Sequence, residues 1–168
     1  LVQLNQSGVI APETPLHQWH YLLSYNKASG VRQVILKDGK MVFTRLGQSL
    51  EGDASTEAGA IEQEVSSTVE YLKRIGLRGV ADIHLYAICG RDIINAMDTN
   101  RMGITSYTLY TPYQLSEQLG WDNVSQPEDR FGDIVLATFG ASYKKSKHIL
   151  WTKQLGNIHR LFVAVPAM

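Results

Sequence analysis

The sequence has a single cysteine, Cys89, which lies within the apolar run HLYAICG. One cysteine excludes an intrachain disulfide and is typical of a protein from a reducing compartment. The sequence also lacks an apolar run of roughly 20 residues, the length that a membrane helix needs, so it predicts no membrane-spanning segment within the chain. No succession of basic, apolar and small residues at the start indicates a signal peptide.

Neither sign of charge is in excess, because 16 Lys and Arg residues balance 16 Asp and Glu residues. No global field therefore attracts nucleic acid or an anionic membrane, and we expect no nucleic-acid partner. The chain has 168 residues and is 44% hydrophobic, which is enough for one core and short for two. We expect one domain over residues 1–168.

The two ends of the chain differ from its middle. Residues 1–15, which contain Pro12 and Pro15, are expected to be a lead-in, and the chain starts without a methionine. From about residue 145 to residue 168 the sequence is basic at first and apolar later, ending in RLFVAVPAM. We expect an excerpt of a longer protein.

The stretch VRQVILKDGKMVFTRL, residues 31–46, predicts two strands joined by a tight turn. Asp38-Gly39 suits a type I′ turn, because both central residues of that turn need φ > 0. If the turn is centred there, Arg32 faces Arg45. Both faces of this hairpin are apolar, so we expect it to lie in the middle of a sheet that is covered on both sides.

The rest of the chain alternates between helix and strand patterns. A helix from Ser125 is predicted because Ser125 and Glu128 have the spacing of a capping box. Strands are expected at residues 19–25, 79–89, 104–111 and 148–152, and helices at residues 55–76, 91–97, 112–120 and from Ser125 onward.

The helix at residues 55–76 has the clearest pattern. Ser55 or Thr56 is its expected N-cap, and Glu57 lies in its first turn, where the helix dipole favours negative charge. Apolar side chains and Thr68 recur at helical spacing from Ile61 to Ile75 and predict the side that the helix buries. The helix at residues 112–120 is predicted because it has Pro at its start and Gly at its end.

The order of the main elements is thus βββαβαβα. Three antiparallel strands followed by helix-linked strands predict an α/β fold with one five-stranded mixed sheet and helices on both faces. This is the element order of the ribonuclease H-like fold, the unit that actin-like proteins carry twice. The chain shows no internal repeat, so we expect one copy.

Two kinds of chemistry belong to that fold. A ribonuclease H-like nuclease binds two metal ions through carboxylates of the first strand, the first helix and the fourth strand. The first strand here has none, and Glu62, Glu64 and Asp82 are better explained as a solvated helix face and a strand-end acid. An actin-like ATPase has an acid and glycines in the turn between the first two strands. Here that turn, SYNKASG, has only Gly30 and no carboxylate, so a nucleotide could be held only by Lys27 and backbone amides.

Other reactive side chains lack the partners that a site needs. His17 and His20 have no third metal ligand nearby in the sequence, and Cys89 has no adjacent histidine. The basic cluster YKKSKH, residues 143–148, is interpreted as a solvated loop. We therefore expect no catalytic residue, no metal and no cofactor.

Five residues are candidates for contacting a protein partner. Arg32 and Arg45, if they face each other, either extend into water or hold a carboxylate from elsewhere in the protein or from a partner. Tyr107 and Tyr110 of the fifth strand, with Tyr113 after it, give a tyrosine-rich composition that is common at interfaces. Tyrosines in strands also pack in ordinary cores, so both interpretations of these three residues stay open.

The succession of VRQVILKDGKMVFTRL, a polar acidic loop and EAGAIEQEVSSTVEYLKRIGL resembles the second actin-like subdomain of inner-membrane platform proteins of type IV pilus and type II secretion machines. The similarity extends over residues 19–161 and is to the PilM and GspL types, and most of all to the BfpC-like proteins of bundle-forming pili. It implies a non-enzymatic scaffold or docking domain on the cytoplasmic side of a bacterial inner membrane. Its partners would be the hexameric assembly ATPase and other platform proteins, and a homodimer is a further partner to consider.

The resemblance also bears on nucleotide binding and on the ends of the chain. PilM-type members bind nucleotide, whereas GspL-type members resemble actin without that capacity, and the SYNKASG turn is similar to the second kind. In GspL-type and BfpC-like members a transmembrane helix follows the actin-like portion. By this resemblance the tail, from about residue 145 to residue 168, would approach a membrane segment, and the membrane would be reached only through segments outside this chain. The alternative is a nucleotide-binding actin-like ATPase module.

Overall fold

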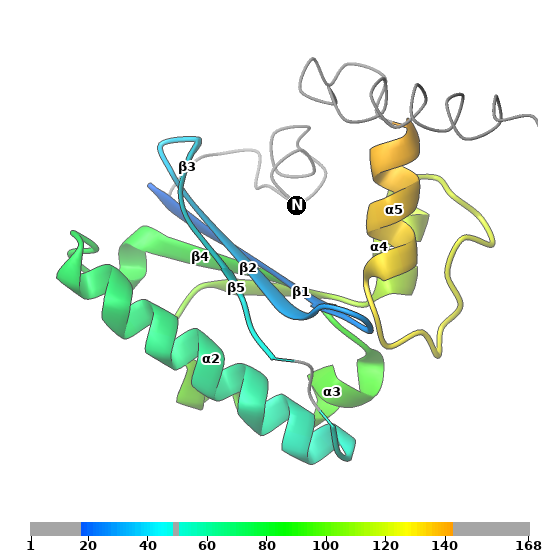
Figure 1. Cartoon of the computed structure of the whole chain (residues 1–168), viewed down its shortest axis with the longest axis horizontal. Helices are drawn as coiled ribbons and strands as arrows, with labels where there is room; N and C mark the ends of the chain where they lie inside the picture. The colour runs from blue at the N-terminus through cyan, green and yellow to red at the C-terminus, as the bar shows by residue number, and fades with distance from the viewer. Residues whose placement is uncertain (1–17, 49–50, 143–168) are drawn as a thin grey trace, which may run out of the picture. The chain divides into compact units, whose positions relative to one another are not determined.

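The computed structural model describes residues 18–48 and 51–142, which form a five-stranded mixed sheet with helices (Figure 1). This confirms the α/β class. The chain divides into two compact units, residues 1–138 and residues 139–168, and the sheet lies wholly in the first. The elements are β1 (Trp19–Asn26), β2 (Gly30–Lys37), β3 (Lys40–Leu46), α2 (Ala54–Arg74), β4 (Ile83–Ile88), α3 (Arg91–Ala96), β5 (Tyr107–Tyr110), α4 (Pro112–Gln118) and α5 (Asp133–Ser142), with short 3₁₀ turns at Val80–Asp82 and Thr99–Met102.

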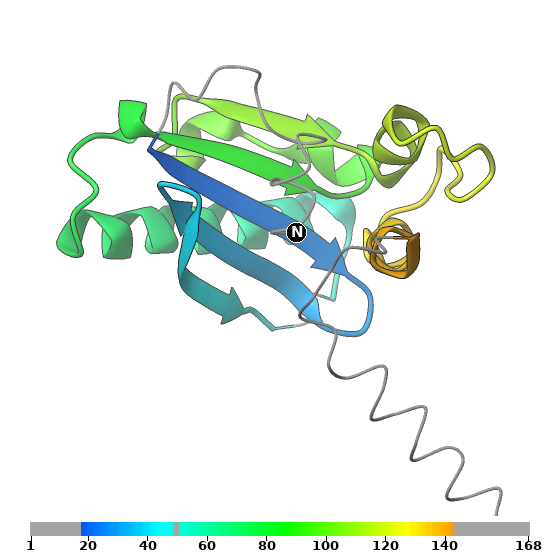
Figure 2. The same ribbon diagram turned by 90° about the horizontal axis from the view of Figure 1, so that it is seen from above.

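The strands lie in the order β3-β2-β1-β4-β5 (Figure 2). β2 is antiparallel to both β1 and β3, whereas β1, β4 and β5 run parallel to one another. The carboxyl ends of these three parallel strands therefore meet at one end of the sheet. In an α/β fold this end is where a ligand is expected, in the crevice outside the strand ends.

The main core lies between the sheet and helices α2 and α3, which cover the same face (Figure 1). The helical spacing of residues 61–75 predicts this face of α2. Its first four members, Ile61, Val65, Thr68 and Leu72, are buried, whereas the last, Ile75, is 44% exposed. The core contains Trp19, Tyr21, Leu23 and Tyr25 of β1, Ile35 of β2, Leu85 and Ala87 of β4, Ile61, Val65, Val69 and Leu72 of α2, and Ile93 of α3. The expectation that helices cover the sheet is confirmed for this face.

The turn of the hairpin is confirmed, because Asp38 and Gly39 both have positive φ, 49° and 74°. The predicted register is wrong beyond the first pairs. Leu36 lies opposite Met41, but Ile35 lies opposite Phe43, so β3 has one extra residue at a β-bulge. The bulge moves every later residue of β3 by one position. Arg32 consequently lies opposite Leu46 rather than Arg45.

The prediction that the hairpin is covered on both sides holds for β2 and fails for β3. The side chains of β2 are buried apart from Arg32 and the half-buried Lys37. β3 is an edge strand, and Met41, Val42 and Leu46 are 58%, 47% and 56% exposed. Its apolar composition therefore does not indicate a place in the middle of the sheet.

Two predicted helix starts are displaced in the structure. α2 is capped by Asp53, whose carboxylate accepts a hydrogen bond from the Thr56 amide at 2.8 Å, and not by Ser55 or Thr56. The helix predicted from Ser125 begins only at Asp133. The Asp129 carboxylate accepts hydrogen bonds from the Ser125 hydroxyl and the Gln126 amide, which closes a local turn in place of a helix. The strand expected at 148–152 lies outside the described residues.

Candidate functional site

The carboxyl ends of β1 and β4 are in contact with the segment that leads into α5. The Gly132 amide donates a hydrogen bond to the Tyr25 carbonyl at 2.8 Å. A Cβ atom on Gly132 would lie 2.6 Å from Ser24 Oγ, and one on Gly90 would lie 2.7 Å from the Cα of Arg130. Real Cβ atoms do not approach other atoms so closely, so only glycine fits at either position. The chain itself therefore occupies the space outside the ends of these two strands.

A cluster of charged side chains fixes this segment to the rest of the fold. Arg130 Nη2 lies 2.8 Å from the carboxylate of Glu57, which is 4% exposed. Arg130 Nε lies 2.7 Å from Asp92 at an angle that makes an ion pair without a hydrogen bond. Burial and the neighbouring Glu57 carboxylate raise the pKa of Tyr25 to about 12. The cluster joins β1, α2 and α3 to the segment before α5.

In the turn between β1 and β2, a backbone amide is hydrogen-bonded to another part of the fold. The Lys27 amide donates a hydrogen bond to the Asp133 carboxylate at 2.7 Å. In a phosphate cradle such amides point at the ligand, and a carboxylate in that position would repel it. Beside the turn is an open hollow of about 340 Å³ whose lining includes Asn26, Ser29, Arg32 and Asp133.

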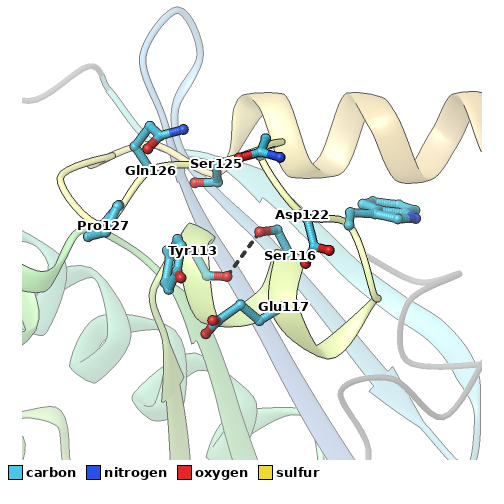
Figure 3. Close-up of a pocket in the computed structure, with 9 residues that line it drawn as sticks. Tyr113, Ser116, Glu117, Asp122, Ser125, Gln126 and Pro127 are labelled. Atoms are coloured by element: carbon cyan, nitrogen blue, oxygen red, sulfur yellow. Dashed lines mark hydrogen bonds between the residues drawn. The ribbon is translucent and has the colours of Figure 1, made fainter.

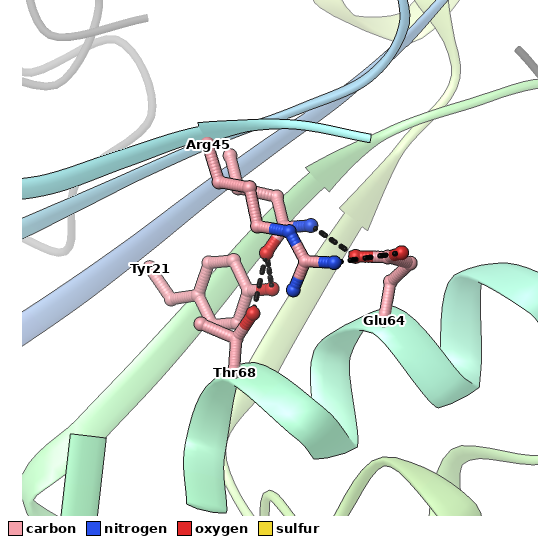
Figure 4. Close-up of polar contacts among 5 residues, drawn as sticks. Tyr21, Arg45, Glu64 and Thr68 are labelled. Carbon is pink, nitrogen blue, oxygen red and sulfur yellow. Dashed lines mark hydrogen bonds and ion pairs between the residues drawn. The ribbon is translucent and has the colours of Figure 1, made fainter. Parts of the chain in front are cut away.

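Arg45, the second predicted partner residue, belongs to a polar network between the sheet and α2 (Figure 4). Its guanidinium lies 3.3 Å from the Glu64 carboxylate, which also accepts a hydrogen bond from Gln33 Nε2 at 2.9 Å. The fully buried Gln33 accepts hydrogen bonds from the Tyr21 and Thr68 hydroxyls, each at 2.6 Å. Burial raises the pKa of Tyr21 above its ordinary value. Arg45 thus pairs with a carboxylate of its own chain, Glu64, which is one of the predicted alternatives.

The two arginines lie on opposite faces of the sheet. Gln33 and Arg45 both bond to Glu64 of α2, so their side chains face that helix. Adjacent side chains on a strand point to opposite faces, so Arg32 faces away from α2. Arg32 is exposed and lines the hollow beside the β1–β2 turn. The structure therefore separates this predicted pair.

The three tyrosines do not form one surface either. The Tyr107 hydroxyl donates to Thr99 at 3.2 Å, and alternation along β5 places Tyr110 on the opposite face. Tyr113 lies on α4, where it lines a hollow of about 260 Å³ together with Ser116, Glu117 and the loop at residues 121–127 (Figure 3). A hydrogen bond to Glu117 and the charge of that carboxylate raise the pKa of Tyr113.

The carboxylates considered for a nuclease lie apart. Glu62 accepts a hydrogen bond from the Asp98 amide at 2.6 Å, Glu64 faces Gln33 and Arg45, and Asp82 lies in the turn before β4. Within residues 18–48 and 51–142, no group of three or more His, Cys, Asp or Glu side chains could hold a metal ion.

Cys89 and His20, the other reactive side chains that the sequence offers, pack within the fold. Cys89 is buried, and burial raises the pKa of its thiol to about 12. His20 stacks on Tyr86, with 6.0 Å between the ring centroids. His17 and the basic cluster at 143–148 lie outside the described residues. Among the helices that the structure describes, none is long and apolar enough to cross a membrane.

Sequence reasoning missed Gln33, Glu57 and Arg130, which organise the two polar clusters. Gln33 could have been noticed, because it is an amide inside the apolar run VRQVIL and must find partners when buried. Glu57 was interpreted only as a helix-dipole residue. Nothing local in the sequence connects it with Arg130, which lies 73 positions away.

Comparison with models of known protein families and with curated proteins finds no match to this chain.

Proposed function

We propose that this chain is a non-enzymatic docking domain of the ribonuclease H-like, actin-like type, from the cytoplasmic side of a bacterial inner-membrane platform that assembles pili or secretes proteins. Its proposed partner is the hexameric assembly ATPase of that machine. The element order supports the fold assignment, since three antiparallel strands precede the helix-linked parallel strands. The sequence resemblance supports the biological setting.

The single observation that carries the proposal is the filled space outside β1 and β4. In an actin-like ATPase this space receives the phosphates of the nucleotide. Here Gly132 is packed against Ser24 and hydrogen-bonded to Tyr25, and the Lys27 amide is bonded to Asp133. A phosphate would have to displace this segment together with the buried ion pair of Glu57 and Arg130, which would leave a buried charge without its partner.

Arg32 is the side chain that best suits a partner contact. It is exposed and lines the hollow of about 340 Å³ together with Asn26, Ser29 and Asp133. A guanidinium binds a carboxylate through charge-assisted hydrogen bonds, and the Asp133 carboxylate in the same lining already accepts the Lys27 amide. We therefore propose that an Asp or Glu side chain of the ATPase binds to Arg32 from the solvent side, outside the part of the hollow where Asp133 would repel it.

Calorimetry of this chain with the N-terminal region of the proposed assembly ATPase tests the proposal. We expect saturable binding, and Arg32→Glu should weaken it about tenfold or more, since the new carboxylate repels the acidic group of the partner. Arg78→Glu is the matched control, because Arg78 is also exposed and lies outside the hollow. No heat of binding at high micromolar concentration, from chains that circular dichroism shows to be folded, would contradict the proposal.

Titration of the same chain with Mg-ATP distinguishes the docking domain from the alternative function, a nucleotide-binding actin-like ATPase module. The filled strand ends lead us to expect no binding. A measurable affinity that is lost in Lys27→Ala would favour the alternative, because the Lys27 ammonium is the cation of the β1–β2 turn.

A further inference from the structure

The part of the chain around β5 and α4 differs in charge from the rest. Residues 102–129 contain four carboxylates and no Lys, Arg or His, although the whole chain has equal numbers of acidic and basic residues. The four are Glu117, Asp122, Glu128 and Asp129. A surface with one sign of charge attracts groups of the opposite sign, so this part of the fold is suited to a cationic partner.

Two of these carboxylates line the same hollow. The hollow of about 260 Å³ is lined by α4 and the loop after it, and Glu117 and Asp122 belong to the lining (Figure 3). Within the described residues neither forms an ion pair, and Arg91, whose charge reaches Tyr113, lines a separate hollow with Glu128. The glutamates of α2, by contrast, are all paired with an arginine or a lysine. The hollow beside α4 therefore carries negative charge that no described ion pair neutralises.

Other polar groups of this hollow offer hydrogen-bond acceptors. Ser116, which is 1% exposed, donates its hydroxyl proton to the Tyr113 carbonyl at 3.0 Å. Ser125, which is 2% exposed, donates to the Asp129 carboxylate at 2.8 Å. Both hydroxyl oxygens keep lone pairs, and Glu117, which is hydrogen-bonded to the Tyr113 hydroxyl, has room for further donors because a carboxylate accepts about four. A group with several N–H donors therefore finds acceptors on more than one element.

Tyr113 adds an aromatic side chain to these acceptors. Tyr113 and Glu117 are four positions apart on α4, so both lie on one side of the helix (Figure 3). A guanidinium stacks on an aromatic face while it donates to a neighbouring carboxylate, whereas an ammonium is a compact and more strongly hydrated charge. The volume of about 260 Å³ is below the roughly 300–1,000 Å³ of pockets for drug-sized ligands, and it suits one side chain.

We propose that this hollow binds the guanidinium of an arginine side chain from a second protein. The guanidinium donates hydrogen bonds to Glu117 and Asp122 and stacks on the ring of Tyr113. The hollow that contains Arg32 is lined by other residues, from the β1–β2 turn and α5. Arginine binding beside α4 is therefore independent of the proposed ATPase docking, and either can fail alone.

Titration of the whole 168-residue chain with N-acetyl-arginine methylamide, followed by nuclear magnetic resonance, tests the proposal. We expect saturable shifts of the backbone amide signals of residues 113–127, with a dissociation constant on the order of 1 mM, as for a ligand of few atoms. N-acetyl-citrulline methylamide is the matched probe, because it has nearly the same shape but an uncharged urea in place of the guanidinium. It should leave these signals unchanged.

Three variants assign the charge that is recognised. Glu117→Gln and Asp122→Asn should each raise the dissociation constant about threefold, because each removes one charge from an exposed pair. Asp38→Asn is the matched control and should leave it unchanged. Asp38 is an exposed carboxylate in the hairpin turn, where its φ is positive, and asparagine accepts that conformation equally well. The amide spectra themselves show whether each variant is folded.

Several results would overturn the proposal. Shifts of equal size with the citrulline probe would show that charge is not recognised. No shifts at residues 113–127, or a dissociation constant that Glu117→Gln and Asp122→Asn leave unchanged, would exclude this hollow as the binding site. Binding that appears only after Lys144, Lys145 and Lys147 are replaced by alanine would show that the basic cluster of the chain itself, and not a second protein, fills the hollow.

Discussion

Two polar clusters attach α2 to the sheet, and they do so with different chemistry. The cluster around Gln33 has a neutral amide at its centre, fully buried, with hydroxyl donors on one side and the Glu64 carboxylate on the other. The cluster around Arg130 is built from charges and lies at the strand ends, where Asp92 is half exposed. The first holds the middle of α2 and the second holds its first turn.

The difference shows how burial selects the kind of polar group. A buried amide with satisfied hydrogen bonds involves no desolvated charge of its own, whereas a buried carboxylate needs a cation beside it. Glu57 is therefore stable only while Arg130 stays in place, which ties the segment before α5 to the sheet. Gln33 does not hold a distant segment in place, but its side chain takes part in three hydrogen bonds.

The strongest test of this comparison is Gln33→Leu. The substitution leaves the buried Tyr21 and Thr68 hydroxyls without their acceptor, so we expect unfolding to become easier by about 3 kcal/mol in urea titrations. Gln63→Leu is the matched control, because Gln63 is an exposed glutamine on α2, the helix that the network attaches, and its cost should stay within about 0.5 kcal/mol. Equal costs for the two variants would show that the network contributes nothing specific.

The second test is Arg130→Met, which removes the cation from Glu57. We expect a loss of about 2 kcal/mol, less than for a fully buried pair because the Arg130 side chain is one-third exposed. Arg101→Met is its control, since Arg101 lies 3.8 Å from the buried Glu62 but is 71% exposed. In the double variant with Glu57→Gln, much of the stability lost in Arg130→Met should return, as urea unfolding can measure. Failure of that recovery would show that Arg130 acts through packing.

The smallest effect is expected for Arg45→Ala. Arg45 is at the rim of the Gln33 network and its side chain is 44% exposed, so solvent screens its pair with Glu64. The free energy of unfolding should fall by only about 0.5 kcal/mol, as it should in Lys73→Ala, which removes the exposed pair with Glu70. A cost that approaches that of Gln33→Leu would place Arg45 at the centre of the network and weaken the contrast between the clusters.

Much of the fold could be predicted from local patterns. The Asp38-Gly39 turn follows from the φ values that a type I′ turn requires, and the structure has both. The spacing of apolar residues in α2 predicted which side it buries, and the Pro112 to Gly120 pattern predicted α4, which Thr111 and Gln114 cap reciprocally. These features depend on residues close in sequence, so local sequence patterns are enough to predict them.

The errors concern contacts between distant residues. The β-bulge in β3 places Phe43 and Arg45 on the face toward α2, where they contact Tyr71 and Glu64. No residue within β3 indicates the bulge. The helix expected from Ser125 starts at Asp133, since Gly132 must pack against Ser24 and Asp129 closes a turn of its own. The candidate site was likewise predicted only in part. Arg32 remains available to a partner, whereas Arg45 is engaged by Glu64.

The sequence by itself determined the kinds of elements, their order and the tight turn of the hairpin, because these depend on side-chain alternation, helical spacing and backbone preference over a few residues. Only the tertiary structure decided that β3 is an exposed edge, that Arg32 and Arg45 face opposite ways, and that Arg130 pairs with Glu57. The physical reason is that burial and charge pairing depend on what lies nearby in space, and for these residues the neighbours come from remote parts of the chain.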